Sequence, residues 1–183
     1  MSSLATRRRP VLRKEYERMI DAGLFRGEHV ELIQGIIVRM SPQGEPHSVV
    51  IQILTRILMP AVLGRADVRV QLPFAAGDDS LPEPDLALVE PGSFGQARPQ
   101  RAFLIIEVSD SSLAEDRREK APLYAAAGVP EMWIVNLPDR LIEVHAEPIR
   151  GAYARVTPYR IGQRVAPNAF PDVLVDVAAL FAG

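Results

Sequence analysis

The segment Ala102 to Val108 (AFLIIEV) constrains the fold most, because the strand that it predicts is apolar on both faces. A strand of this kind normally lies in the middle of a sheet that is covered on both sides. Glu107 is the exception within it. A buried carboxylate costs several kcal/mol unless it is paired, hydrogen-bonded, protonated or bound to a cation. The segment therefore predicts a covered sheet with a specific reason for an acid inside it.

The elements expected around this strand mix helices with further strands. Apolar side chains at helical spacing, each run followed by a glycine, predict helices at residues 11–22, 45–63 and 112–127. Alternating or β-branched runs predict a hairpin at 29–40 and strands at 68–74, 85–89, 132–136, 141–146 and 152–159. This mixture predicts an α/β fold at the border of α+β, with a central mixed sheet flanked by helices.

The third of these helices carries two local signals. Ser112 and Glu115 have the spacing of a capping box, which predicts a helix start at Ser112. Pro122 lies inside the segment, where its ring clashes with the carbonyl group of Arg118 and its nitrogen cannot donate a hydrogen bond. We therefore expect a kink, or two short helices that abut, before Gly128.

Length and composition restrict the class of protein. With 183 residues, 48% of them hydrophobic, the chain fits one domain. We assign that domain to residues 11–183 and expect residues 1–10 to be a basic, disordered N-terminal arm. The absence of cysteine excludes disulfides and thiolate metal sites and is compatible with a reducing cytosol. No run approaches the roughly 18 apolar residues that span a bilayer, so we expect a soluble, cytoplasmic protein without a membrane partner. The formal net charge of −2 counts against a nucleic-acid partner.

Three acidic residues stand at the ends of predicted strands. They are Glu31 in the hairpin, Asp85 after Pro84, and Glu107 late in its apolar strand. If these carboxylates converge, their mutual repulsion calls for a cation, and hard divalent ions such as Mg²⁺ accept carboxylate, water and phosphate oxygens. The backbone carbonyl group of Val108 is a further candidate ligand. The acids thus predict a metal site suited to hydrolysis.

Two basic side chains are candidates for the same pocket. Lys120 lies on the helix that leaves the Glu107 strand, from which its ammonium can reach the acids, orient a water and oppose phosphate charge. His47, at the head of the second helix, is a candidate ligand or proton carrier.

Each candidate also has a plain structural interpretation. Asp85 follows a proline, as strand-start residues often do. Lys120 has Asp116 four residues before it, which is the spacing of a solvated ion pair. His47 suits a capping or surface position, and Glu31 suits pairing with a cation on a neighbouring strand. The functional hypothesis rests on the combination of these residues.

Several short motifs together resemble the Uma family of restriction-endonuclease-like proteins, in the PD-(D/E)XK nuclease superfamily. The resemblance runs from about residue 11 to residue 155. The segment from Lys120 through Tyr124 to Gly128-Val-Pro-Glu-Met-Trp-Ile-Val135 is its most specific part. The other motifs are Val30-Glu31-Leu-Ile-Gln-Gly35, Ser41-Pro42 with His47, Glu83-Pro84-Asp85-Leu86, Ile106-Glu107-Val108, and Asp116 with Lys120.

The resemblance implies a fold and roles for these residues. It implies a mixed sheet flanked by helices, and a divalent-metal site built from Asp85 and Glu107 with assistance from Glu31. It also implies that Lys120 is the catalytic lysine, displaced onto the helix. The superfamily pattern has its lysine at the position that Ser109 occupies in this chain.

Three functions are compatible with these observations. The leading hypothesis is a nuclease that needs Mg²⁺ or Mn²⁺ and hydrolyses phosphodiester bonds in DNA, with a homodimer as the expected assembly. The alternative is a catalytically silent binding or assembly module on a nuclease-like fold, which the acidic composition favours. A third, weaker hypothesis is a hydrolase of another phosphate ester.

Overall fold

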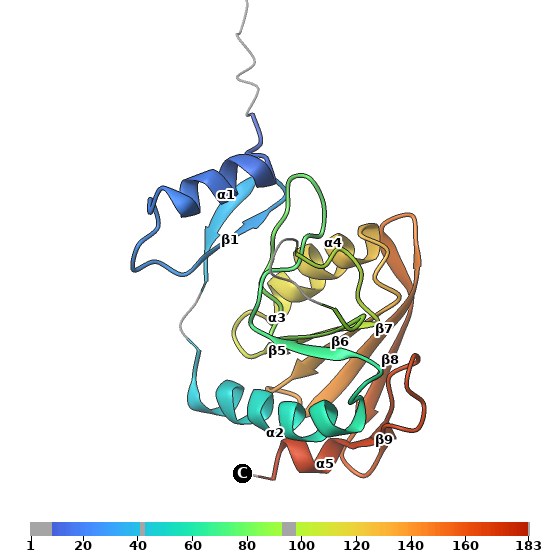
Figure 1. The fold of residues 1–183 in the computed structure, drawn as a ribbon. Helices are drawn as coiled ribbons and strands as arrows, with labels where there is room; N and C mark the ends of the chain where they lie inside the picture. Colours follow the sequence, from blue (N-terminus) through green and yellow to red (C-terminus); the bar gives the residue numbers. More distant parts are fainter. Residues whose placement is uncertain (1–8, 41–42, 93–97, 183) are drawn as a thin grey trace, which may run out of the picture.

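A six-stranded mixed sheet forms the centre of the fold in the computed structural model, which describes residues 9–40, 43–92 and 98–182 (Figure 1). Its spatial order is β3-β4-β5-β6-β7-β8. The strands are β3 (Asp67–Val70), β4 (Leu86–Val89), β5 (Leu104–Ser109), β6 (Glu131–Asn136), β7 (Leu141–Ile149) and β8 (Ala152–Arg160). β5 and β6 run parallel, and the other neighbours are antiparallel. All six residues of β5 are buried, so its predicted central position is confirmed.

Helices cover both faces of this sheet, as predicted (Figure 1). On one face lie α2 (Glu45–Ala61) and α5 (Val177–Leu180), and on the other lie α3 (Leu113–Glu115), η1 (Asp116–Lys120) and α4 (Ala121–Ala126). Successive side chains of a strand point to opposite faces. Ile106 and Val108 therefore join the core under α2, and Ile105 joins the core under α4. Glu107 shares the face of Ile105, which directs its carboxylate toward η1 and α4. Among the described residues, no helix is both long and apolar enough to cross a membrane.

The helical segment after β5 differs from the prediction. The prediction of a capping box is wrong. Ser112 has helical backbone angles, and its hydroxyl group donates to the Asp116 side chain instead of capping a helix. The predicted abutting helices are present as three pieces, with the π-helical turn η1 between α3 and α4. A π turn shifts the hydrogen-bond ladder by one residue, and here it ends at Lys120, two residues before Pro122, which cannot donate. Lys120 is the last residue of that turn.

Other predicted boundaries are confirmed in part. The first hairpin consists of β1 (Val30–Ile33) and β2 (Ile36–Arg39), and the strands β6, β7 and β8 form the predicted meander. The strand predicted at 68–74 ends at Val70, because Gln71 has a left-handed backbone with φ of 50° that breaks the extended ladder. Helix α1 (Arg13–Asp21) is slightly shorter than predicted. The pair β9 (Arg164–Val165) and β10 (Val175–Asp176) was not predicted. Residues 1–8 of the predicted arm and the Ser41-Pro42 motif lie outside the described residues.

The N-terminal hairpin is anchored to residues 79–81, and in this way it carries Glu31 to the sheet. Leu81 N–H donates to the Leu32 carbonyl oxygen over 2.7 Å, and Gly35 N–H donates to that of Asp79 over 2.7 Å. Gln34 and Gly35 have φ of 48° and 76°, as the two central residues of a type I′ turn require. The position of Glu31 therefore depends on this turn.

Gly35→Ala is expected to destabilise the protein more than Gly27→Ala does. Both glycines have a left-handed backbone, which costs an alanine roughly 1–2 kcal/mol. A Cβ atom at Gly35 would in addition contact Pro10 Cβ and lie 2.9 Å from Pro10 Cα, whereas nothing lies within 4 Å of one at Gly27. Overpacking of this kind adds about 1–3 kcal/mol. Urea unfolding of the two variants measures the difference, and equal losses would contradict it.

Candidate active site

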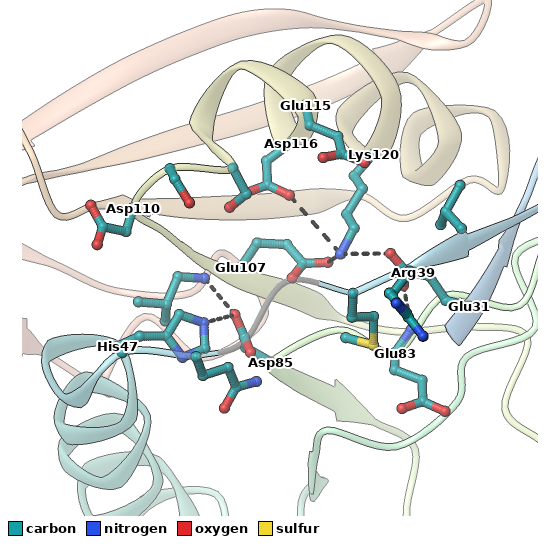
Figure 2. A pocket seen from close by; sticks show the side chains of 17 residues that line it. Glu31, Arg39, His47, Glu83, Asp85, Glu107, Asp110, Glu115, Asp116 and Lys120 are labelled. Atoms are coloured by element: carbon teal, nitrogen blue, oxygen red, sulfur yellow. Dashed lines mark hydrogen bonds and ion pairs between the residues drawn. The ribbon is translucent and has the colours of Figure 1, made fainter. Parts of the chain in front are cut away.

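A pocket of about 120 Å³ opens where the first hairpin, the start of α2, the end of β5 and η1 meet. All of the candidate residues from the sequence line it, namely Glu31, His47, Asp85, Glu107, Val108 and Lys120. Figure 2 shows the side chains of Glu31, His47, Asp85, Glu107 and Lys120 directed into one space. Segments that are distant in sequence thus place the predicted acids and bases side by side.

Asp85 and Glu107 come together through the register of β4 and β5. Leu86 pairs with Ile106, so Asp85, one residue before β4, continues that register opposite Glu107. Opposite residues of an antiparallel pair lie on the same face of a sheet. The two carboxylates therefore face the same pocket, and both residues are buried. Asp85 is more than a strand-start residue.

Three groups hold the Asp85 carboxylate, one of which is the Gln71 amide, 3.4 Å from Oδ1. The Oδ2 atom of Asp85 accepts the Val108 N–H over 2.8 Å and lies 3.0 Å from Nε2 of His47. The His47 side chain is 13% exposed, so the surface interpretation of this histidine is wrong. His47 is the third residue of α2, and the helix start therefore brings its ring to the end of β4.

Lys120 inserts its ammonium between carboxylates. The Nζ atom lies 3.3 Å from Oε1 of Glu31, 3.3 Å from Oε1 of Glu107 and 4.0 Å from Oδ1 of Asp116 (Figure 2). Its side chain is 11% exposed, so the interpretation as a solvated pair with Asp116 is wrong. Lys120 is also one of only two lysines in the chain, and the other, Lys14, is exposed.

The electrostatics of the pocket favour a bound cation. Burial raises the pKa of the Glu107 carboxyl well above its usual value; Lys120 lowers it in part, and Asp85, Asp116 and Glu31 raise it further. Burial alone lowers the pKa of the Lys120 ammonium, but the same carboxylates outweigh burial and raise it. Lys120 therefore stays charged, and Glu107, buried among other acids, is stabilised by either a proton or a further cation beside it.

The lining of the pocket is acidic as a whole. Seven of the described lining residues are acidic, whereas the basic side chains are those of Arg39, Lys120 and His47. Within the described ranges, no group of three or more His, Asp or Glu side chains is arranged as a metal site. Mg²⁺ takes one or two carboxylates and completes its shell with water and substrate oxygens, so it does not require a larger protein donor set.

Sequence reasoning gave two residues at the site no functional role: Asp116 was considered only as a solvated partner of Lys120, and Tyr124 only as part of a family motif. The Tyr124 hydroxyl donates to Oε1 of Glu107 over 2.7 Å, and its ring is fully buried. Asp116 accepts hydrogen bonds from Ser109 and Ser112 beneath Lys120. The signal for both was the spacing: Asp116, Lys120 and Tyr124 stand four residues apart, which places them along one helix face.

Comparison with known proteins identifies the family. The family model Uma2, described as "Putative restriction endonuclease", matches residues 13–178. The chain belongs to the Uma2 family. The resemblance noted in the sequence is confirmed, and the match spans all of the candidate residues. A comparison with curated proteins finds no match.

The fold of this Uma2 chain is shared with a solved structure. That structure is described as a "putative nuclease belonging to DUF820" from Anabaena variabilis ATCC 29413. The TM-score is 0.66 at 16% sequence identity, and the similarity covers 84% of this chain and 89% of that chain. The predicted nuclease-like sheet flanked by helices is thereby confirmed.

Proposed function

We propose that this Uma2-family protein is a phosphodiesterase that hydrolyses DNA with the help of Mg²⁺ or Mn²⁺. The observation that carries the proposal is the pair Asp85 and Glu107 on adjacent strands, with the Lys120 ammonium 3.3 Å from Glu107. Phosphodiester hydrolysis needs a metal ion and a fixed positive charge near the phosphate. This pocket combines carboxylates for the first with an ammonium for the second.

The donor set fits a hard divalent cation, and we assign its ligands to Asp85, Glu107 and the main-chain carbonyl group of Val108. In a strand the N–H and C=O groups of one residue point to the same side, and the Val108 N–H points to Asp85. The raised pKa of Glu107 supports the assignment, because a cation beside it favours the ionised form. When bound, such an ion lowers the pKa of a water molecule and balances phosphate charge.

The side chains around these ligands orient the reaction. Lys120 donates to the attacking water and to a phosphate oxygen, which opposes the charge that develops in the transition state. Glu31 assists by holding the ammonium from the side opposite Glu107. His47 steadies Asp85 and is the candidate proton carrier. Since the hairpin that carries Glu31 completes the pocket, we propose that residues 11–183 act as one domain.

One observation favours the alternative of a catalytically silent module. Seven acidic side chains repel a polyanion such as DNA unless cations intervene. The nuclease proposal answers this objection by placing a divalent cation among the acids. The two proposals therefore differ in a measurable way, since only the nuclease couples metal binding to DNA cleavage.

Purified protein is expected to cleave DNA in Mg²⁺ or Mn²⁺ and to leave it intact in EDTA. Supercoiled, linear double-stranded and single-stranded DNA are incubated with the parent and with the double variant Asp85→Asn/Glu107→Gln, prepared identically to reveal contaminating nucleases. Calorimetry measures Mn²⁺ binding to both proteins, and light scattering decides whether the proposed homodimer forms. Metal binding without cleavage above the double variant would favour the silent module. Cleavage of only a small phosphate diester would favour the third hypothesis.

A further inference from the structure

Asp116 is buried beneath Lys120 and is held by two hydroxyl groups. Ser109 Oγ donates to Oδ2 of Asp116 over 2.7 Å, and Ser112 Oγ donates to the same oxygen over 2.8 Å. The other oxygen, Oδ1, lies 4.0 Å from Lys120 Nζ. Asp116 is 3% exposed, so its charge acts in a poorly solvated place. Figure 2 shows Asp116 above Glu107 and His47 below it.

This arrangement connects the metal-ligand strand to the helix that carries the lysine. Ser109 is the last residue of β5. Because it follows Glu107 by two residues, the two side chains lie on the same face of the sheet. Ser112 leads into α3, and Asp116 opens η1. The two hydroxyls hold Oδ2, so the carboxylate cannot turn that oxygen toward Lys120. Asp116 therefore attracts the Lys120 ammonium from 4.0 Å. The ammonium stays closer to Glu107 and Glu31, at 3.3 Å from each.

We propose that Asp116, held by Ser109 and Ser112, is the positioning residue that aims the Lys120 ammonium at Glu107. The carboxylate supplies the attraction, and the two hydroxyls determine its direction. Ser109 thus supports a lysine that reaches the pocket from the helix. The catalytic meaning of this role rests on the proposed nuclease function, whereas the restraint on Lys120 does not.

Steady-state kinetics test the catalytic part of the proposal. Asp116→Asn keeps the size of the side chain but removes its charge, and we expect kcat to fall about 10- to 100-fold with KM and Mn²⁺ affinity within about twofold of the parent. In a Lys120→Ala background the same substitution is expected to cause no further loss, because the residue acts through Lys120. Glu119→Gln is the matched control: it removes one exposed charge from the same helical turn and is expected to leave kcat unchanged.

Lysine labelling tests the restraint without using nuclease activity. The chain has two lysines, so an amine-reactive ester followed by mass spectrometry of the peptides reports Lys120 against exposed Lys14 in one sample. We expect the ratio of Lys120 to Lys14 labelling to rise severalfold in Asp116→Asn. The double variant Ser109→Ala/Ser112→Ala is expected to raise it in the same direction, and it serves if Asp116→Asn does not fold.

The outcomes separate the two proposals. An unchanged labelling ratio in both variants would overturn the positioning role, as would a further loss of kcat on adding Asp116→Asn to Lys120→Ala. A raised ratio in a protein that cuts no DNA would support the restraint on Lys120 and contradict the nuclease.

Discussion

Lys120→Ala is expected to lower kcat for DNA cleavage by about 10²- to 10³-fold while Mg²⁺ affinity stays within about twofold of the parent. The carboxylates of Asp85 and Glu107 hold the ion in our proposal, so the loss falls on water orientation and on charge stabilisation in the transition state. Lys14→Ala is the matched control, because it removes the other lysine of the chain at an exposed site. If the Lys120→Ala variant has a normal kcat, Lys120 does not take part in the reaction. If the variant no longer binds Mg²⁺, Lys120 contributes to the metal site instead.

The same variant is expected to be less stable than the parent without metal, by about 3–5 kcal/mol at neutral pH. Removing the ammonium leaves Glu31, Glu107 and Asp116 buried around an uncompensated negative charge. Because Lys120 lowers the pKa of Glu107, its loss lets that pKa rise further. Protonation of Glu107 then relieves part of the repulsion, so the destabilisation is expected to shrink as the pH falls toward 5. Urea unfolding at two pH values measures it; a pH-independent loss would point to packing alone.

Glu107→Gln is expected to weaken Mg²⁺ binding about tenfold or more and to abolish cleavage, while the metal-free fold becomes as stable as the parent or more stable. The substitution removes one ligand charge and, with it, part of the repulsion among the buried acids. The amide oxygen can still accept the Tyr124 hydroxyl. Glu131→Gln is the matched control for metal affinity: Glu131 is also buried, but it binds Trp133 and Asn168 outside the pocket.

The stability difference between the parent and the Glu107→Gln variant is expected to depend on pH. The pKa of Glu107 is raised in the folded state, so the folded chain binds more protons than the unfolded chain between the unfolded value of about 4.3 and the raised value. Stability from this group is therefore full below the unfolded pKa and declines as the pH rises through the folded pKa. The glutamine variant lacks this decline. The two metal-free proteins are expected to converge at acidic pH and to diverge at neutral pH.

Added Mg²⁺ is expected to make the parent more stable than the Glu107→Gln variant at neutral pH. A ligand that binds only the folded state stabilises it in proportion to its affinity, so the parent is expected to gain more from Mg²⁺ than the variant does. Thermal unfolding with and without Mg²⁺ at neutral pH measures both effects on the same samples. Equal Mg²⁺-dependent gains in parent and variant would exclude Glu107 as a ligand.

The sequence alone was sufficient where the determining interactions are local or periodic. The apolar run of β5 required burial on both faces, and this predicted its central place in the sheet. Gln34-Gly35 suited a tight turn, and the hairpin formed there. Pro122 could not continue an ordinary helix, and the helical segment is indeed divided before it. The family motifs lie in these same elements, so the fold class followed from the sequence as well.

Only the tertiary structure decided which side chains meet at the site and how they are bonded. Whether Lys120 was solvated or buried depended on the hairpin of Glu31, which is 89 positions away in the chain and is anchored through residues 79–81. The spacing of Ser112 and Glu115 suggested a capping box, in which the Ser112 oxygen accepts a backbone N–H, but the hydroxyl instead donates to Asp116, which also accepts from Ser109 at the end of β5. A hydroxyl or an ammonium takes whichever partner the packed chain brings within reach. Local spacing cannot rank these partners, because their distances arise only when the sheet, the hairpin and the helices pack together.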